Sequence, residues 1–142
     1  MRHTVHVLPI LLAFSLSSCG SPPETRLPVY PVKGTALFKG QPAEGALVVL
    51  NPTGGQTSET IHPSGTVQTD GTFQVTTYET NDGAPEGSYT VTVFWPEPPI
   101  SPIDAPDSGP DRLGGRYLDP QTSPWKIEVA PEPNTLVPLE LK

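Results

Sequence analysis

Apolar and polar side chains alternate with a period of two along most of the chain after residue 30, which predicts β-strands. The clearest strand covers residues 88–95, where Tyr89, Val91 and Val93 share one face and threonines alternate with them. No stretch of useful length has the spacing of three and four residues that marks an amphipathic helix. We therefore expect a domain built of strands.

The other predicted strands are short runs of β-branched and aromatic residues, each bounded by Gly, Pro, Asn or Asp. They cover residues 30–38, 46–50, 66–69, 72–77, 125–129 and 137–141. Pro138 places the last of them at a sheet edge, because proline has no N–H for a second ladder. This pattern predicts an all-β chain with a single antiparallel β-sandwich of about seven strands.

A dipeptide between two of these runs, Asp70-Gly71, is the strongest short hairpin signal in the chain. Both residues accept positive φ, so they suit a type I′ turn, whose twist matches that of paired strands. Phe73 and Val75 then point to one side of the second strand, and its polar residues point to the other. We expect the hairpin to join 66–69 to 72–77.

The N-terminus differs from the rest. An apolar run at residues 5–16 follows Arg2, and it is too short for a transmembrane helix, which needs about 20 residues. It is typical of a secretory signal peptide. The chain's one cysteine, Cys19, follows directly and ends the sequence Leu16-Ser17-Ser18-Cys19.

This order of an apolar residue, two small residues and a cysteine resembles the lipobox of bacterial lipoproteins. In that family the cysteine sulfur is diacylated, the peptide is cut before it, and the new amine is usually acylated. The resemblance implies a signal peptide at 1–18, a lipid-anchored, proline-rich tether at 19–29 and a domain at 30–142. Gly20 lacks the Asp that retains some lipoproteins in the inner membrane, so an outer-membrane location, facing the periplasm or the exterior, is preferred. An ordinary signal peptide with a chance cysteine is the alternative.

The charge balance excludes one class of partner. The chain has fifteen acidic and eight basic side chains, which gives a net charge of −7, and Lys and Arg form no cluster in the sequence. Binding to nucleic acid or to an anionic lipid surface therefore has no electrostatic support. Acylation of Cys19 would leave no thiol for a disulfide, so burial and the β-ladders must stabilise the fold.

Several turn and strand motifs together resemble the carboxypeptidase-regulatory-like domain. They are "V-x-G", "G-x-P", "G-A-x-V", "D-G-x-F" and "P-x-G-x-Y-x-V-x-V", at residues 32–34, 40–42, 45–48, 70–73 and 85–93. The resemblance implies a transthyretin-like (prealbumin-like) sandwich, related in architecture to Ig-like domains. Such domains are generally non-catalytic folding or adhesion modules. Each motif also has a plain physical cause, because the glycines suit turns and the apolar residues suit a core.

Catalytic chemistry has few candidate residues. His62 is the only histidine after residue 18, whereas related sandwich enzymes need several histidines for hydrolysis or for iron binding. Zinc sites also draw mostly on His and Cys. We therefore expect no enzyme activity and no cofactor, with a small hydrolase that uses loop carboxylates as an unfavoured alternative.

Two residue groups remain as candidate ligand contacts. Glu79, Asp82 and Glu86 share one loop and are weak candidates for a calcium site, although their spacing is not that of an EF-hand. Tyr117 and Trp125 would stack on a sugar ring if exposed, and burial in the core is the alternative. The sequence thus predicts a lipid-anchored, non-catalytic module of the cell envelope with a binding or structural role. Its expected partners are the membrane through the anchor, and an envelope protein or a glycan. A carbohydrate- or calcium-dependent adhesion domain is the main alternative.

Overall fold

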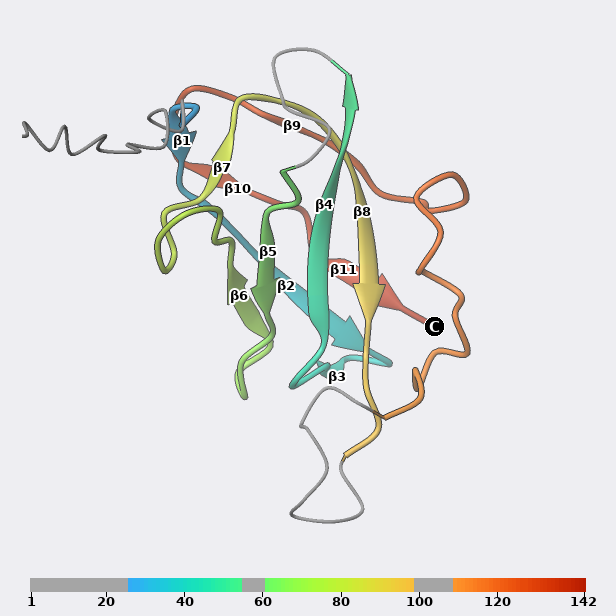
Figure 1. The fold of residues 1–142 in the computed structure, drawn as a ribbon. Coiled ribbons are helices and arrows are strands. Elements are labelled where there is room, and N and C mark those ends of the chain that lie inside the picture. The colour runs from blue at the N-terminus through green and yellow to red at the C-terminus, as the bar shows by residue number, and fades with distance from the viewer. Residues whose placement is uncertain (1–25, 55–60, 99–108) are drawn as a thin grey trace, which may run out of the picture.

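The computed structural model describes residues 26–54, 61–98 and 109–142, and every regular element within them is a β-strand (Figure 1). The strands form two layers that pack face to face, so the predicted β-sandwich is confirmed. The predicted signal peptide and Cys19 lie outside the described residues, as does most of the tether. Within those residues no helix is long and apolar enough to cross a membrane.

The front sheet has four antiparallel strands in the order β5-β4-β8-β9. Their bounds are β4 Leu47–Gly54, β5 Ser64–Thr66, β8 Gly87–Phe94 and β9 Lys126–Val129. The back sheet has five strands around β2, with β3 and β6 on one side and β10 and β11 on the other. Their bounds are β2 Val32–Phe38, β3 Gln41–Pro42, β6 Thr72–Gln74, β10 Asn134–Thr135 and β11 Leu139–Leu141. A small third pair joins β1 (Val29–Tyr30) to β7 (Ala84–Pro85).

The C-terminal strands differ in direction from the predicted antiparallel arrangement. Both β10 and β11 run parallel to β2, with Leu139 opposite Ala36 and Leu141 opposite Phe38. The chain reaches them from β9 in the front sheet, so it crosses between the layers and does not turn back in a hairpin, which makes a parallel pairing possible. Within the described chain β11 pairs with β2 alone, so the edge position indicated by Pro138 is confirmed.

The Asp70-Gly71 turn is present, but the predicted type I′ geometry is wrong. Gly71 has a φ of +85°, whereas Asp70 is not among the residues with positive φ. The Gly71 N–H donates to the Gln68 carbonyl at 2.9 Å and the Gln68 N–H donates to Thr72 O at 2.7 Å, as in a longer hairpin with a left-handed glycine. The Asp70 carboxylate accepts hydrogen bonds from the Thr72 N–H and hydroxyl, which stabilises this turn.

The core lies between the two sheets and follows the predicted alternation. The inward side chains of β8, Tyr89, Val91 and Val93, are fully buried. Across the layer they face buried residues of the back sheet, among them Ala36 and Phe73. The Tyr89 hydroxyl donates to the Pro85 carbonyl at 2.8 Å, and burial, with a smaller contribution from Tyr78, raises the pKa of Tyr89 to about 12. This phenol therefore stays neutral inside the core.

Candidate functional site

The structure places Tyr117 and Trp125 together at the edge of the front sheet beyond β8. The Val93 N–H donates to the Tyr117 carbonyl at 3.0 Å, and the Val91 N–H donates to the Trp125 carbonyl at 2.9 Å. The centroids of the two rings are 4.7 Å apart, and the ring planes are inclined to each other by 41°. Tyr117 is only 7% exposed and Trp125 is half-buried against the core. The alternative of burial is therefore the correct one for Tyr117, whereas Trp125 keeps part of its surface exposed.

The carboxylate of Asp82 stabilises its own loop. One oxygen accepts from the Thr77 N–H at 2.7 Å, and the other accepts from the N–H groups of Tyr78 at 3.0 Å and Glu79 at 2.9 Å. Glu79 Oε1 lies 3.7 Å from Nη1 of exposed Arg26. Glu86 is exposed between β7 and β8. The described residues hold no group of three or more His, Cys, Asp or Glu side chains arranged for a metal ion. Asp82 thus has a structural role that its sequence neighbours did not reveal.

This role predicts a pH-dependent contribution to stability. Burial alone would raise the pKa of Asp82, but the N–H donors of Thr77, Glu79 and Tyr78 outweigh burial and lower that pKa below 3.8. A lowered pKa means that the ionised form stabilises the fold. The contribution is therefore present above about pH 4 and is lost as the pH falls through the folded pKa.

We expect Asp82→Asn to lower the free energy of unfolding by about 1–2 kcal/mol at pH 7, because an amide offers one acceptor to three donors. Urea unfolding from pH 7 to pH 3 measures this, and the difference from wild type should shrink towards the acidic end. The matched control is Glu79→Gln in the same loop, where an exposed ion pair contributes about 0–1 kcal/mol. Equal pH profiles for wild type and Asp82→Asn would contradict the assignment.

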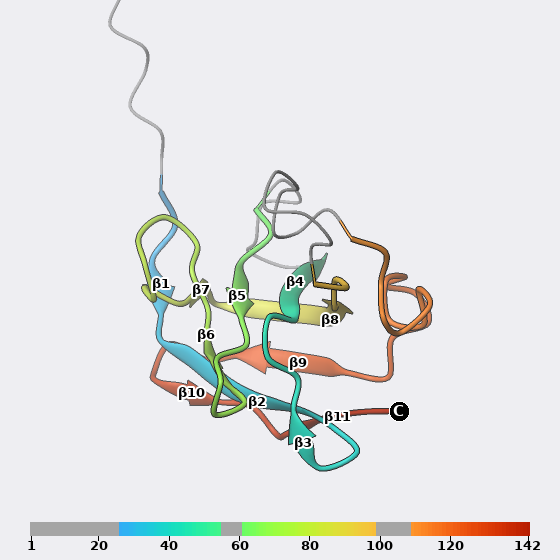
Figure 2. The same cartoon turned by 90° about the horizontal axis from the view of Figure 1, so that it is seen from below.

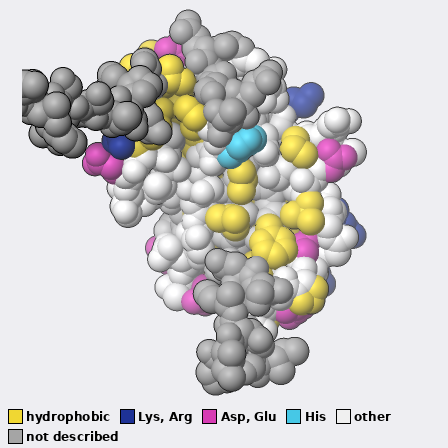
Figure 3. All heavy atoms as spheres, in the orientation of Figure 1, with side chains coloured by type: hydrophobic (Ala, Val, Ile, Leu, Met, Phe, Trp, Pro, Cys, Tyr) yellow, Lys and Arg dark blue, Asp and Glu magenta, His cyan; other side chains and the backbone are white. Residues whose placement is uncertain are grey.

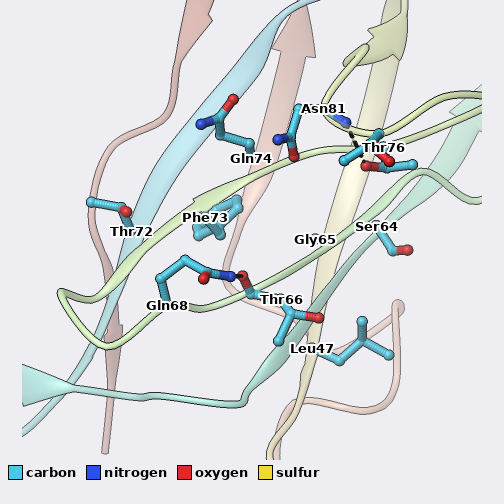
Figure 4. A pocket seen from close by; sticks show the side chains of 11 residues that line it. Leu47, Ser64, Gly65, Thr66, Gln68, Thr72, Phe73, Gln74, Thr76 and Asn81 are labelled. Carbon is cyan, nitrogen blue, oxygen red and sulfur yellow. Dashed lines mark hydrogen bonds between the residues drawn. The ribbon is translucent and has the colours of Figure 1, made fainter.

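A groove lies between β5 and β6, where one strand joins the front sheet and the other joins the back sheet (Figure 4). Its volume is about 520 Å³, within the range of about 300–1,000 Å³ that is common for small-molecule sites. The lining residues come from β4, β5, β6, the turn between β5 and β6, and the loop after β6. They are Leu47, Ser64, Gly65, Thr66, Gln68, Thr72, Phe73, Gln74, Thr76, Thr80 and Asn81.

Hydroxyl and amide side chains dominate this lining. Such groups both donate and accept hydrogen bonds, and they carry no charge at neutral pH. Some already have partners: Gln68 Nε2 donates to Thr66 O at 3.0 Å, and the Thr76 hydroxyl accepts from the Asn81 N–H at 2.9 Å. The Gln74 amide makes no hydrogen bond to another described residue and is exposed. Such a lining can form hydrogen bonds with a ligand, and none of its residues is a His, Cys, Asp, Glu, Lys or Arg.

The sequence did not reveal this groove. The alternation in 72–77 predicted that Thr72, Gln74 and Thr76 share the face opposite Phe73, and their exposure agrees with that. A local sequence pattern does not indicate that the two strands of the hairpin, β5 and β6, join different sheets. The groove depends on that divergence.

The outer face of the front sheet continues from the groove. Leu47 and Val49 of β4 and Phe94 of β8 lie on it, all half-buried, and Leu47 is directly opposite Phe94. Figure 3 shows hydrophobic side chains in the middle of this face, with the acidic and basic side chains mostly around its rim. The surface next to the groove is thus uncharged and partly apolar.

No family model matches this chain, and no curated protein shows significant sequence similarity to it.

Proposed function

We propose that this protein is a lipid-anchored, non-catalytic binding domain of the bacterial cell envelope. The groove between β5 and β6 is the observation that carries the binding role, because it presents uncharged hydrogen-bonding side chains to solvent. The anchor is inferred from the lipobox-like sequence that ends at Cys19. Fatty-acyl attachment there would place the domain at a membrane surface, with the outer membrane preferred.

The β-sandwich and the motifs between residues 32 and 93 support this proposal through the resemblance to carboxypeptidase-regulatory-like domains. Modules of that family are generally non-catalytic. A fold alone supports a function weakly, so the resemblance adds to the groove and does not replace it.

Of the adhesion alternatives, the carbohydrate form is favoured over the calcium form. The oxygens of Asp82 already accept three backbone hydrogen bonds, and Glu79 faces Arg26. Hydrogen-bonding groups gather instead in the groove, where the lining suits a ligand without charge.

Two measurements on the full-length protein test this function. Mass spectrometry of protein recovered from bacterial membranes should show a mature chain that begins at Cys19 and carries acyl groups. An unacylated N-terminus at another residue would contradict the anchor.

The second measurement tests whether the groove binds envelope material. Gln74→Trp places a large ring in the groove, whereas Gln41→Trp places the same ring on exposed β3, on the same side of β2. We expect Gln74→Trp to retain much less cross-linked envelope material than wild type and Gln41→Trp to retain a normal amount. Equal retention by all three proteins would contradict a binding role for the groove.

A further inference from the structure

The hairpin that forms the groove is closed by hydrogen bonds at both ends and open between them. At one end Ser64 and Thr76 exchange backbone hydrogen bonds of 3.0 and 2.7 Å. At the other end the Gln68 N–H donates to Thr72 O. No β-bridge joins the residues between these ends in the described chain.

The register of each strand shows where the intervening peptide groups point. The Val75 N–H donates to the Val32 carbonyl, so Gln74, opposite Lys33, is in a non-hydrogen-bonded pair with β2. Residues of such a pair direct their own N–H and C=O away from the partner strand. The backbone groups of Gln74 therefore point towards β5.

The backbone groups of Thr66 in β5 point towards β6 in the same way. The Val67 N–H donates to the Ala46 carbonyl, so Thr66, opposite Leu47, directs its backbone groups away from β4 and towards β6. Thr66 and Gln74 thus face each other across the groove without forming a ladder pair. Their side chains line the groove as well (Figure 4).

Gly65 allows β5 to approach the backbone of β6 closely. A Cβ atom at Gly65 would overlap the Gln74 carbonyl oxygen. This carbonyl therefore occupies the space that a side chain at residue 65 would need. The close approach is possible only for glycine.

We propose that the groove between β5 and β6 binds a neutral saccharide. This inference rests on the proposed function and names its ligand class. Sugar hydroxyls donate and accept hydrogen bonds, as the Thr66 hydroxyl and the Gln74 side-chain amide do. The half-buried side chain of Leu47 supplies an apolar contact for the C–H face of a ring.

Charge and geometry disfavour the other ligand classes. The chain carries a net charge of −7 and the groove lining is uncharged, so an anionic saccharide would meet repulsion without a compensating cation. An extended peptide pairs with a strand over several residues. The Ser64–Thr76 and Gln68–Thr72 hydrogen bonds close the gap at both ends and leave no room for such pairing.

The test titrates the full-length protein with four probes: a neutral hexose oligosaccharide, a neutral N-acetylated oligosaccharide, a uronic-acid oligosaccharide and an uncharged extended peptide. Calorimetry measures affinity, and NMR amide shifts locate the contact. We expect one or both neutral saccharides to bind, with the largest shifts at Thr66 and Gln74. Gln74→Ala and Thr66→Val should each weaken binding by about tenfold, the effect of losing one or two hydrogen bonds. Gln41→Ala is the matched control and should bind as wild type does.

Binding of only the uronate or only the peptide would overturn the proposal, as would shifts confined to another surface or no binding at all. Unchanged affinity in both groove variants would overturn it too. The retention test with Gln74→Trp separates this failure from failure of the proposed function. If Gln74→Trp retains less cross-linked envelope material than wild type although no saccharide binds, the result would support a binding domain with a different ligand.

Discussion

Replacing Phe73 with alanine should lower the free energy of unfolding by about 3–5 kcal/mol, the usual cost of truncating a fully buried aromatic ring. Phe73 is 0% exposed and lies in β6 opposite Gly34 of β2. A Cβ atom at Gly34 would be 2.6 Å from Phe73 Cζ and 3.3 Å from Leu136 Cβ, so the ring occupies the space that Gly34 leaves. Gly34 has no side chain to move into the cavity, so it cannot help to fill the space that the ring leaves.

Equilibrium unfolding in urea measures this loss, and the next residue of the strand supplies the control. Gln74→Ala alters an exposed side chain and should change the free energy of unfolding by less than about 0.5 kcal/mol. An effect of Phe73→Ala as small as that of Gln74→Ala would show that the ring does not fill the core.

A double-mutant cycle tests the contact itself. Gly34→Ala alone should destabilise the protein, because the added methyl group meets the Phe73 ring. In the Phe73→Ala background the same methyl group enters an empty space, so its cost should fall or reverse. Additive effects would contradict a direct contact between Gly34 and Phe73.

The inward positions were predictable because a strand exposes alternate residues to opposite faces, whatever its neighbours are. Spacing alone predicts that Tyr89, Val91 and Val93 share one face, and all three are buried. Strand direction is different, because it depends on the path of the chain between sheets. The alternation in 137–141 therefore located β11 but did not indicate that it runs parallel to β2.

The candidate site was harder to predict for the same reason. The acidic neighbours of Asp82 indicate a possible metal ligand, whereas its carboxylate accepts hydrogen bonds from the N–H groups of residues 77–79. Tyr117 lies in an irregular segment where no period assigns a face. The groove arises from the divergence of β5 and β6 into different sheets, a long-range property that no window of sequence contains.

Cys19→Ser should abolish fatty-acid attachment completely, which is the largest functional effect that we expect from a single substitution. The lipobox-like sequence offers one thiol, and the chain has no other cysteine to take its place. Two acyl chains, at about 0.8 kcal/mol for each buried methylene, make membrane attachment effectively permanent, whereas one chain binds reversibly. In lipoproteins the peptide is cut before the acylated cysteine, so the variant should also fail to be cut before residue 19. Labelling of cells with a tagged palmitate and the mass of the N-terminal peptide measure both effects.

Ser18→Ala is the matched control, because it keeps a small residue before the cysteine and leaves the thiol intact. It should be labelled and processed like wild type. Labelling that persists in Cys19→Ser would place the lipid on another residue, and absence of label from wild type and Ser18→Ala would refute the anchor. If the anchor fails while Gln74→Trp still loses envelope material, the binding role of the groove stands without it, because the groove lies wholly within the folded domain and the anchor lies before it in the chain.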